Sequence, residues 1–373
     1  MIHHSVVIVG AGPAGIGMGA ALRDFQIADA LILDRHEIGA SFRRWPVEMR
    51  LITPSFNSTP FGILDLNAVA LQTSVANFLG SEHPTGAEYA RYLEALAKAC
   101  ELRVKTPVPV SDVQPRDAGG FLLETSLGAI TADFVIWAAG EFQSPRLDAF
   151  EGSELCLHTG RVRSFRELPG KERVVIGAFE SGMDATIHLA RRGVNVRLLN
   201  AAPDFAMTDQ DPSRSLSPYT RSRMEAVCRE SHNVRVAHNA RVTTVTKDHG
   251  KYAIHLVEGA PVFTNQPPLM ATGFCGSLGP VESLFEYRDS GEVLLSDDDE
   301  STLNRGLFLA GPIVRHEHHI FCYIYKFRQR FAVIAETIAE RLNIPVADDL
   351  LELYKKNQMR LVDLSCCGAE CVC

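Results

Sequence analysis

Short apolar runs that end in glycine-rich turns recur along the chain, and they predict buried strands followed by helices. The first run, Val6-Val7-Ile8, leads into the turn Gly10-Ala11-Gly12-Pro13-Ala14-Gly15 and then into small and apolar residues up to Leu22. A β-branched run that stops at Gly-x-Gly-x-x-Gly predicts a strand, a tight turn and a helix whose N-terminus faces a pyrophosphate. The next apolar run ends in Asp34 about twenty residues later, where an acid binds a ribose 2′-hydroxyl in such sites. We therefore expect a dinucleotide site at this turn.

A second motif of the same kind lies in the middle of the chain. Val174-Val175-Ile176 precedes Gly177-Ala178-Phe179-Glu180-Ser181-Gly182, and the following apolar strand ends in Asn200. Phe179 stands at the middle glycine position, so the backbone is expected to approach a phosphate less closely there. Asn200 replaces the acid that selects NAD, which favours NADPH and leaves NADH as the alternative. Three arginines on the following loop are either ligands of the 2′-phosphate or solvated surface residues: Arg214, Arg221 and Arg223.

The remaining hydrophobic pattern predicts a mixed α/β protein. His83-Pro84-Thr85-Gly86 starts a helix, because apolar residues follow at helical spacing through Ala97. Short β patterns run from Val108 to Val113 and from Phe121 to Thr125. A long amphipathic helix is expected from about His319 to Leu342. Three further buried strands end in small residues, and they are Phe134 to Gly140, Met270 to Gly273 and Leu307 to Pro312.

Length and charge limit the classes of protein. A chain of 373 residues is long enough for about two or three domains. Its formal net charge of -8 argues against a nucleic-acid partner, which favours a basic surface. No apolar run reaches the length of about 18 residues needed to span a membrane, and no basic residue before Arg23 marks a secretion signal. We expect a cytoplasmic protein.

The cysteines fall into two groups. Five are scattered singly and are expected to be reduced core residues: Cys100, Cys156, Cys228, Cys275 and Cys322. The other four, Cys366, Cys367, Cys371 and Cys373, all follow Ser365. Neighbouring thiols of this kind form a strained disulfide, bind a soft metal ion or exchange with other disulfides. A tail whose thiols have no function is the alternative.

Two loops carry further candidate site residues. Aromatic side chains on a loop beside a cofactor stack on flat rings, so Trp45 either contacts a cofactor ring or anchors the core. Arg35, Ser41 and Phe42 lie on the same stretch and are further candidate cofactor-binding residues. The second loop is Arg315-His316-Glu317-His318-His319. It has three interpretations: a polar rim over a cofactor, the start of a surface helix, or a metal site. No third ligand group supports a metal, so we predict none. As part of a rim, His316 and His319 are candidates for proton transfer.

Residues 1 to about 345 resemble the thioredoxin-reductase-like flavoproteins, in which a nicotinamide domain interrupts an FAD domain. The resemblance is carried by the two glycine motifs and by the segments that end in Gly140 and Gly273, where such proteins cross between domains. Bacillithiol-disulfide-reductase-like proteins are the most similar members, and Phe150-Glu151-Gly152 with His158 is similar to the linker of flavin-containing monooxygenases. The likeness implies an α/β fold of two Rossmann-like domains, FAD and NAD(P)H as cofactors, and a homodimer. The implied boundaries are 1–155 and 269–345 for the FAD domain, 165–268 for the nicotinamide domain, and 346–373 for a C-terminal helix and tail.

The sequence departs from this family where its members carry reactive groups. Gly311-Pro312 stands where they have Gly-Asp, so one side-chain contact to the FAD is lost. Bacillithiol-type proteins place a cysteine in the first glycine motif, where this chain has Ala14. The tail Leu364-Ser365-Cys366-Cys367 is similar to the C-terminal dithiol of mercuric reductases. We therefore predict electron transfer from NAD(P)H through flavin to a small-molecule or thiol-linked acceptor, with Cys366 and Cys367 as shuttle. A flavin monooxygenase and a soft-metal or redox sensor with structural FAD are the alternatives.

Overall fold

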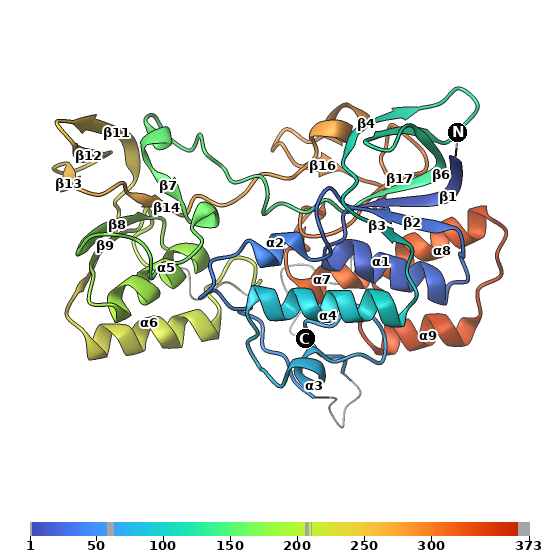
Figure 1. The fold of residues 1–373 in the computed structure, drawn as a ribbon, viewed down its shortest axis with the longest axis horizontal. Helices are drawn as coiled ribbons and strands as arrows, with labels where there is room; N and C mark the ends of the chain where they lie inside the picture. The colour runs from blue at the N-terminus through green and yellow to red at the C-terminus, as the bar shows by residue number, and fades with distance from the viewer. Residues whose placement is uncertain (1, 58–62, 206–208, 210, 365–373) are drawn as a thin grey trace. The chain divides into compact units, whose positions relative to one another are not determined.

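The computed structural model describes residues 2–57, 63–205, 209 and 211–364 (Figure 1). These residues form two compact units, and the chain passes from the first to the second and back twice. The first unit contains the described parts of 1–43, 54–141 and 276–373, and the second contains those of 44–53 and 142–275. The prediction of an α/β fold with one dinucleotide-binding domain inserted in another is confirmed. No helix of the described ranges is long and apolar enough to cross a membrane.

The first unit is built on a seven-stranded sheet with the order β3-β2-β1-β6-β5-β4, in which β17 also pairs with β6. The central strands are parallel, whereas β4 and β5 form an antiparallel extension. Val6, Val7 and Ile8 are fully buried, as expected for a strand covered on both faces. The strands are β1 (Ile2–Val9), β2 (Ala30–Leu33), β3 (Val104–Lys105), β4 (Val110–Pro115), β5 (Phe121–Thr125), β6 (Ile130–Trp137) and β17 (Leu307–Leu309).

Helices pack against this sheet, and α1 contacts both α4 and α8 (Figure 1). The predicted start of α4 is confirmed: Thr85 caps the helix and Glu88 completes a capping box. The C-terminal helix α9 docks through Tyr354, whose hydroxyl donates to Asp24 and whose ring meets Phe25 edge-on. The helices are α1 (Pro13–Asp24), α2 (Ala40–Arg43), α3 (Val75–Leu79), α4 (Gly86–Ala99), α7 (Ile324–Phe327), α8 (Phe331–Arg341) and α9 (Asp348–Lys356), with 3-10 turns at Gly279–Leu284 and Arg328–Arg330.

The prediction of one helix from His319 to Leu342 is wrong at its N-terminal end. Residues Arg315–His316 (β18) and His319–Ile320 (β19) form an antiparallel hairpin, and its turn residue Glu317 has a φ of 45°. The short pair Glu286–Tyr287 (β15) and Val293–Leu294 (β16) lies earlier in the same unit. Helical structure begins only at Ile324 and is interrupted by a 3-10 turn. That turn carries two buried arginines, Arg328 and Arg330, whose guanidinium groups need acceptors that a regular surface helix does not offer.

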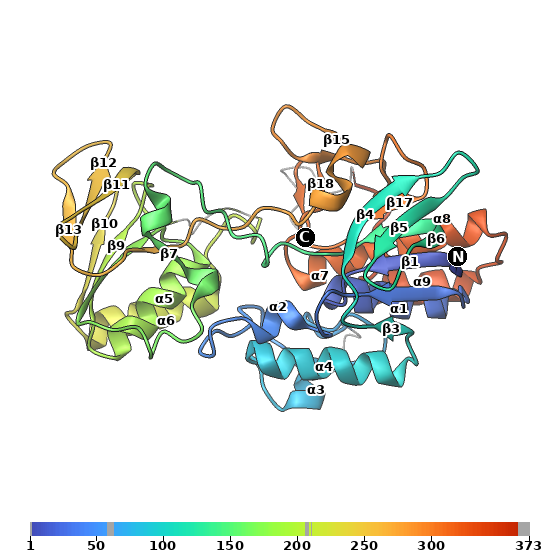
Figure 2. The ribbon, with the colours of Figure 1, turned by 45° about the horizontal axis from the view of Figure 1, so that its top comes forward.

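The second unit has a five-stranded parallel sheet with the order β10-β9-β8-β14-β7. Helices α5 and α6 cover one face and a three-stranded antiparallel sheet covers the other (Figure 2). Alternation along β8 explains the two cores, because Val175 packs with the helices and Val174 with the small sheet. The elements are β7 (Leu157–His158), β8 (Glu172–Ile176), α5 (Glu180–Arg191), β9 (Asn195–Leu199), α6 (Pro218–Glu230), β10 (Val234–Ala237), β11 (Val242–Asp248), β12 (Lys251–Leu256), β13 (Val262–Thr264) and β14 (Leu269–Met270), with 3-10 turns at Ser153–Leu155 and Thr159–Arg161.

The compact units do not coincide with the cofactor-domain boundaries expected from the sequence, and those boundaries stay a prediction. The crossings lie at Glu141 and Gly276 rather than at 155 and 269, and α9 belongs to the first unit. Residues 44–53, expected within the FAD domain, belong to the second unit. Trp45 is therefore part of that unit, where its ring centroid lies 6.4 Å from that of Phe142.

Candidate functional site

The first glycine turn has the geometry of a dinucleotide-binding turn. Gly10 has a φ of 115°, and a Cβ there would lie 2.3 Å from the carbonyl oxygen of Ala138. A Cβ on Gly15 would lie 1.8 Å from the carbonyl oxygen of Gly10, so both positions require glycine for close packing. Gly12 differs, because a Cβ there would meet nothing within 4 Å. The open space lies directly before α1, whose first residue Pro13 has no N–H to lose. This opening lies where the glycine motif predicts a pyrophosphate.

Asp34 holds the turn from the side. Its carboxylate accepts hydrogen bonds from the backbone N–H of Ala11, at 2.7 Å, and of His36, at 2.8 Å. Gly39 N–H donates to the Ala11 carbonyl at 3.0 Å, so the segment after β2 lies against the glycine turn. Arg35 and Ser41 lie on this segment, and Phe42 packs on the Tyr89 ring of α4 with centroids 4.7 Å apart. The predicted residues Asp34 and Gly10 to Gly15 thus lie together.

The C-terminal part of the first unit returns to the same turn. Gly311 follows β17 with a φ of 112°, and a Cβ there would lie 3.2 Å from the Cβ of Ala14. Gly140 lies three residues after β6, the strand between β1 and β17, and has a φ of 70° and open space at its Cβ position. Because β1, β6 and β17 are parallel, their carboxyl ends meet at one edge of the sheet. Gly140, Gly311 and Pro312 therefore lie at the edge where α1 begins.

Glu141 was not predicted as a site residue, although it directly follows this strand end. Burial raises the pKa of its carboxyl group, and the positive charge of Arg315 opposes that shift. The guanidinium of Arg315 itself donates to the carbonyl oxygens of Pro312 and Val314, the second at 2.8 Å. A carboxyl group whose pKa is raised by burial thus lies at the same sheet edge.

The second glycine turn repeats the geometry of the first. Gly177 has a φ of 101°, and a Cβ there would lie 2.6 Å from the carbonyl oxygen of Ala271. A Cβ on Gly182 would lie 1.8 Å from the carbonyl oxygen of Gly177, the same value as for the first turn. Phe179 precedes α5 at the position of Gly12 and is 38% exposed. Gly273 lies three residues after the neighbouring strand β14 and has a φ of 78°, a placement like that of Gly140 in the first unit.

Glu180 and Ser181 start α5, and the Glu180 side chain faces α6. Its carboxylate accepts hydrogen bonds from the Ser217 N–H, the Ser217 hydroxyl and the Thr220 hydroxyl. Burial raises the pKa of Glu180, and these hydrogen bonds oppose the shift. The carboxylate therefore joins the starts of two helices, and its contact to a cofactor stays a prediction.

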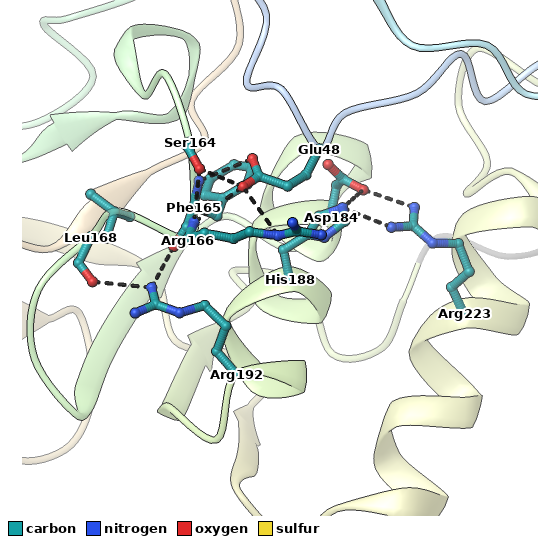
Figure 3. Close-up of polar contacts among 9 residues, drawn as sticks. All are labelled: Glu48, Ser164, Phe165, Arg166, Leu168, Asp184, His188, Arg192 and Arg223. Atoms are coloured by element: carbon teal, nitrogen blue, oxygen red, sulfur yellow. Dashed lines mark hydrogen bonds and ion pairs between the residues drawn. The ribbon is translucent and has the colours of Figure 1, made fainter.

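Of the three arginines considered for a 2′-phosphate, Arg223 is already paired. Its guanidinium donates to Asp184 Oδ1 at 2.8 Å and approaches His188 Nε2 at 3.0 Å (Figure 3). The His188 ring stacks on Phe165 with centroids 5.9 Å apart. This arrangement joins α5 and α6. Asn200, which ends β9, donates through its side chain to the Asp204 carbonyl.

Glu48 clamps residues 44–53 to the second unit, and sequence analysis missed it. Its carboxylate accepts from the Ser164 hydroxyl at 2.5 Å and from the backbone N–H of Phe165 and Arg166 at 3.1 and 3.2 Å (Figure 3). Burial alone would raise the pKa of Glu48, but these three donors outweigh it and hold the pKa below its usual value. No local sequence pattern predicts this contact, because Glu48 and Ser164 lie more than a hundred residues apart in the sequence.

The two predicted catalytic histidines have different surroundings. His316 is 5% exposed, and its Nε2 pairs with Asp299, which also accepts from Arg330 Nε at 2.9 Å. His319 is partly exposed, and its Nε2 lies 2.7 Å from the carbonyl oxygen of Leu364. His316 is thus held inside the protein, whereas His319 contacts the end of the described chain.

The segment that leads to Leu364 is attached to the first unit by several contacts. Arg330 donates to the Leu361 carbonyl, and the Leu361 N–H donates to the Gln329 carbonyl at 3.0 Å. Met359 is fully buried, and Arg360 binds both carboxylate oxygens of Glu336. The tail residues Cys366 and Cys367, predicted as catalytic, lie outside the described residues.

Two glycine turns at strand ends, one in each unit, have the geometry of two dinucleotide-binding turns. A family model described as pyridine nucleotide-disulphide oxidoreductase matches residues 7–311, and the chain belongs to this family. The protein is thus an oxidoreductase enzyme of the flavin-dependent class, and the predicted resemblance is confirmed.

Individual relatives lie within the groups that the sequence resembles. Bacilliredoxin reductase Bdr of Bacillus subtilis (strain 168) is 23% identical over 350 residues, which cover 92% of this chain and all of that protein. The structure of bacillithiol disulfide reductase Bdr (YpdA) from Staphylococcus aureus matches with a TM-score of 0.74 at 18% identity, over 91% of this chain and 99% of that one. A flavin-containing monooxygenase from Stenotrophomonas maltophilia matches with a TM-score of 0.71 at 17% identity, over 92% and 100%. These structural likenesses show the fold.

Proposed function

We propose that the protein is an NADPH-dependent FAD enzyme that reduces a disulfide or another thiol-linked acceptor. FAD would bind across Gly10 to Gly15, with its ribose at Asp34 and further contacts from Gly140, Gly311 and Pro312. NADPH would bind at Gly177 to Gly182. The observation that carries this assignment is the repeated turn geometry, since both units keep the same glycine contacts and Gly12 leaves open space before α1.

The overall reaction balances without a further reactant. NADPH and a proton convert one disulfide to two thiols, so the nicotinamide loses two electrons and the sulfurs gain them. The flavin, when bound, accepts hydride from one side of the reaction and supplies electrons to the other. The chain supplies the two glycine turns proposed to bind the cofactors and the side chains that are held in place around these turns.

The cysteines of the tail are the proposed electron shuttle. Ala14 puts no thiol in the first glycine turn, so electrons pass directly to the acceptor or through other cysteines. Leu364, held by His319, is followed after one residue by Cys366, and two residues of extended chain span at most about 7 Å. The anchored segment therefore starts the tail on the unit that carries the first glycine turn.

A truncation tests this proposal. The full chain and a chain ending at Leu364 would be compared for NADPH oxidation under nitrogen, with oxidised glutathione and 5,5′-dithiobis(2-nitrobenzoate) as acceptors. We expect the truncated protein to keep its yellow colour and its reduction by NADPH, and to lose acceptor turnover. Full turnover by the truncated protein would contradict the shuttle, and no turnover of either acceptor by the full chain would contradict the reductase.

A flavin monooxygenase is the second candidate, and the linker before β8 favours it. His158 is buried, accepts from the Gly160 N–H through Nδ1 and lies 3.0 Å from the Gly273 carbonyl through Nε2. Gly152 lies against β11, where a Cβ would be 1.9 Å from the Val245 carbonyl oxygen. The predicted monooxygenase-like linker is thus tightly built. NADPH consumption that requires both oxygen and an organic substrate would support this candidate over the reductase.

A further inference from the structure

A cavity of about 290 Å³ lies at the edge of the second sheet opposite its glycine turn. Its lining includes Glu172, Asn195 and Asn233, which lie at or before the amino ends of β8, β9 and β10. Gly177 and Gly182 follow the carboxyl end of β8. In a parallel sheet these two ends face opposite edges, so the cavity is separate from the predicted nicotinamide site.

The cavity is rich in positive charge. Arg197 of β9 and Arg235 of β10 are direct neighbours in the parallel register, both are exposed, and both line the cavity. Neither forms an ion pair within the part of the chain that the structure describes. Arg173 and His232 also contribute to the lining, where Glu172 is the only acid. Because the whole chain carries a net charge of -8, this cluster is a local exception.

Polar atoms in the lining lack partners. Arg173 is 3% exposed, and its two Nη atoms donate to the carbonyls of Pro169 and Pro267. Its Nε is buried and has no hydrogen-bond acceptor among the described residues, and Asn233 Oδ1 is buried without a donor there. A buried polar atom without a partner costs free energy unless a ligand or water satisfies it. Glu172 does not neutralise the cluster fully, because this one carboxylate lines the cavity together with three arginines, Arg173, Arg197 and Arg235.

Two neighbouring guanidinium groups that form no ion pair among the described residues attract an anion. Like charges directly opposite on adjacent strands destabilise a sheet. Strands lie about 4.8 Å apart, so one phosphate or carboxylate group is able to contact both guanidinium groups at once. From this geometry we infer that the cavity binds a small polyanion, a phosphate ester or a dicarboxylate, at a site distinct from both dinucleotide turns.

The test is a binding titration on the full-length protein. Pyrophosphate and citrate are the probes, measured by calorimetry and by the shift in melting temperature at low ionic strength. The variants are Arg197→Ala and Arg235→Ala, and Arg229→Ala is the matched control because it is an exposed arginine of the same unit outside the cavity lining. We expect each cavity variant to weaken binding of at least one probe by about tenfold or more and the control to leave it unchanged. The preferred probe tells phosphate esters from dicarboxylates.

The melting temperature without anion and the reduction of the flavin by NADPH give two further tests of the site. Without anion, each single cavity variant should melt at or above the temperature of the wild type, because a like-charge contact is removed. Reduction of the flavin by NADPH should be unchanged. Failure of both probes to bind, equal weakening by Arg229→Ala, or a lower melting temperature of the anion-free variants would overturn the site. The arginines would then protect β10, which is the edge strand of its sheet.

Discussion

His319 Nε2 lies 2.7 Å from the carbonyl oxygen of Leu364, so a hairpin between β17 and α7 holds the last described residue of the chain. Arg330 reinforces this attachment at Leu361 while its Nε binds Asp299, the partner of His316. The two predicted histidines therefore belong to one polar network with separate functions. His316 stabilises the hairpin from inside, and His319 fixes the start of the tail.

Replacement of His319 should affect the second half of the reaction only. His319→Ala removes the contact to Leu364, so we expect acceptor turnover to fall several-fold while the rate of flavin reduction by NADPH stays constant. His318→Ala is the matched control, because His318 is an exposed neighbour on the same hairpin turn. Stopped-flow absorbance separates the two half-reactions. Equal rates for His319→Ala and wild type would show that the contact has no part in turnover.

The first glycine turn gives a prediction about flavin content. Gly12→Val should fold, since its φ of -82° is ordinary and a Cβ there meets nothing within 4 Å, but its side chain would fill the proposed pyrophosphate space. We expect soluble, colourless protein with an unchanged circular dichroism spectrum. Gly15→Ala should instead disrupt folding, because its Cβ would lie 1.8 Å from the Gly10 carbonyl oxygen. A yellow Gly12→Val protein would refute the assignment of FAD to this turn.

The arginines near the second turn are expected to separate into structural and binding groups. Arg223→Ala leaves the buried carboxylate of Asp184 with only His188 Nε2, at 3.4 Å, as a charge partner and should cost up to about 3–5 kcal/mol in the free energy of unfolding. Arg214→Ala and Arg221→Ala should leave stability unchanged, and at least one should raise KM for NADPH without raising KM for NADH. Urea unfolding and steady-state kinetics with both nucleotides measure these effects. Unchanged KM for NADPH in both variants would remove these arginines as ligands of the 2′-phosphate.

Glu48 gives the second unit a pH-dependent contribution to stability. The pKa of its carboxyl group is lower in the folded protein than the ordinary value of 4.5, because Ser164 and two backbone N–H groups donate to the charged form. This contribution is fully present above pH 4.5 and is lost as the pH falls through the lower, folded-state pKa. Glu48→Gln should therefore be less stable than wild type at neutral pH, with a difference that shrinks in acid. If the stability difference between Glu48→Gln and wild type stays constant down to the pH at which Glu48 is fully protonated, the hydrogen bonds to the charged carboxylate are not its cause.

Local patterns predicted the glycine turns and most strands, because each depends on a few consecutive residues. Gly10 and Gly177 have the positive φ values that the glycine turns require. Thr85 and Glu88, three residues apart in the sequence, predict the start of α4. The hairpin at His316 was missed because it depends on Asp299 and on a carbonyl 45 residues further along the chain. Residues 44–53 group with the second unit, which no local pattern indicates, since the hydrogen bonds of Glu48 reach across more than a hundred residues. Contacts between distant segments leave no periodic pattern to detect.

The central claim, that the tail cysteines exchange electrons with the flavin, is tested most directly by counting electrons. Oxidised full-length protein and the variant Cys366→Ser/Cys367→Ser would be titrated anaerobically with NADPH while flavin absorbance and free thiols are followed. A flavin and a disulfide each take up two electrons, so we predict uptake of about four electrons per subunit in the wild type and about two in the variant, with two additional thiols only in the wild type. Uptake of about two electrons by both proteins, with no new thiols, would contradict the account.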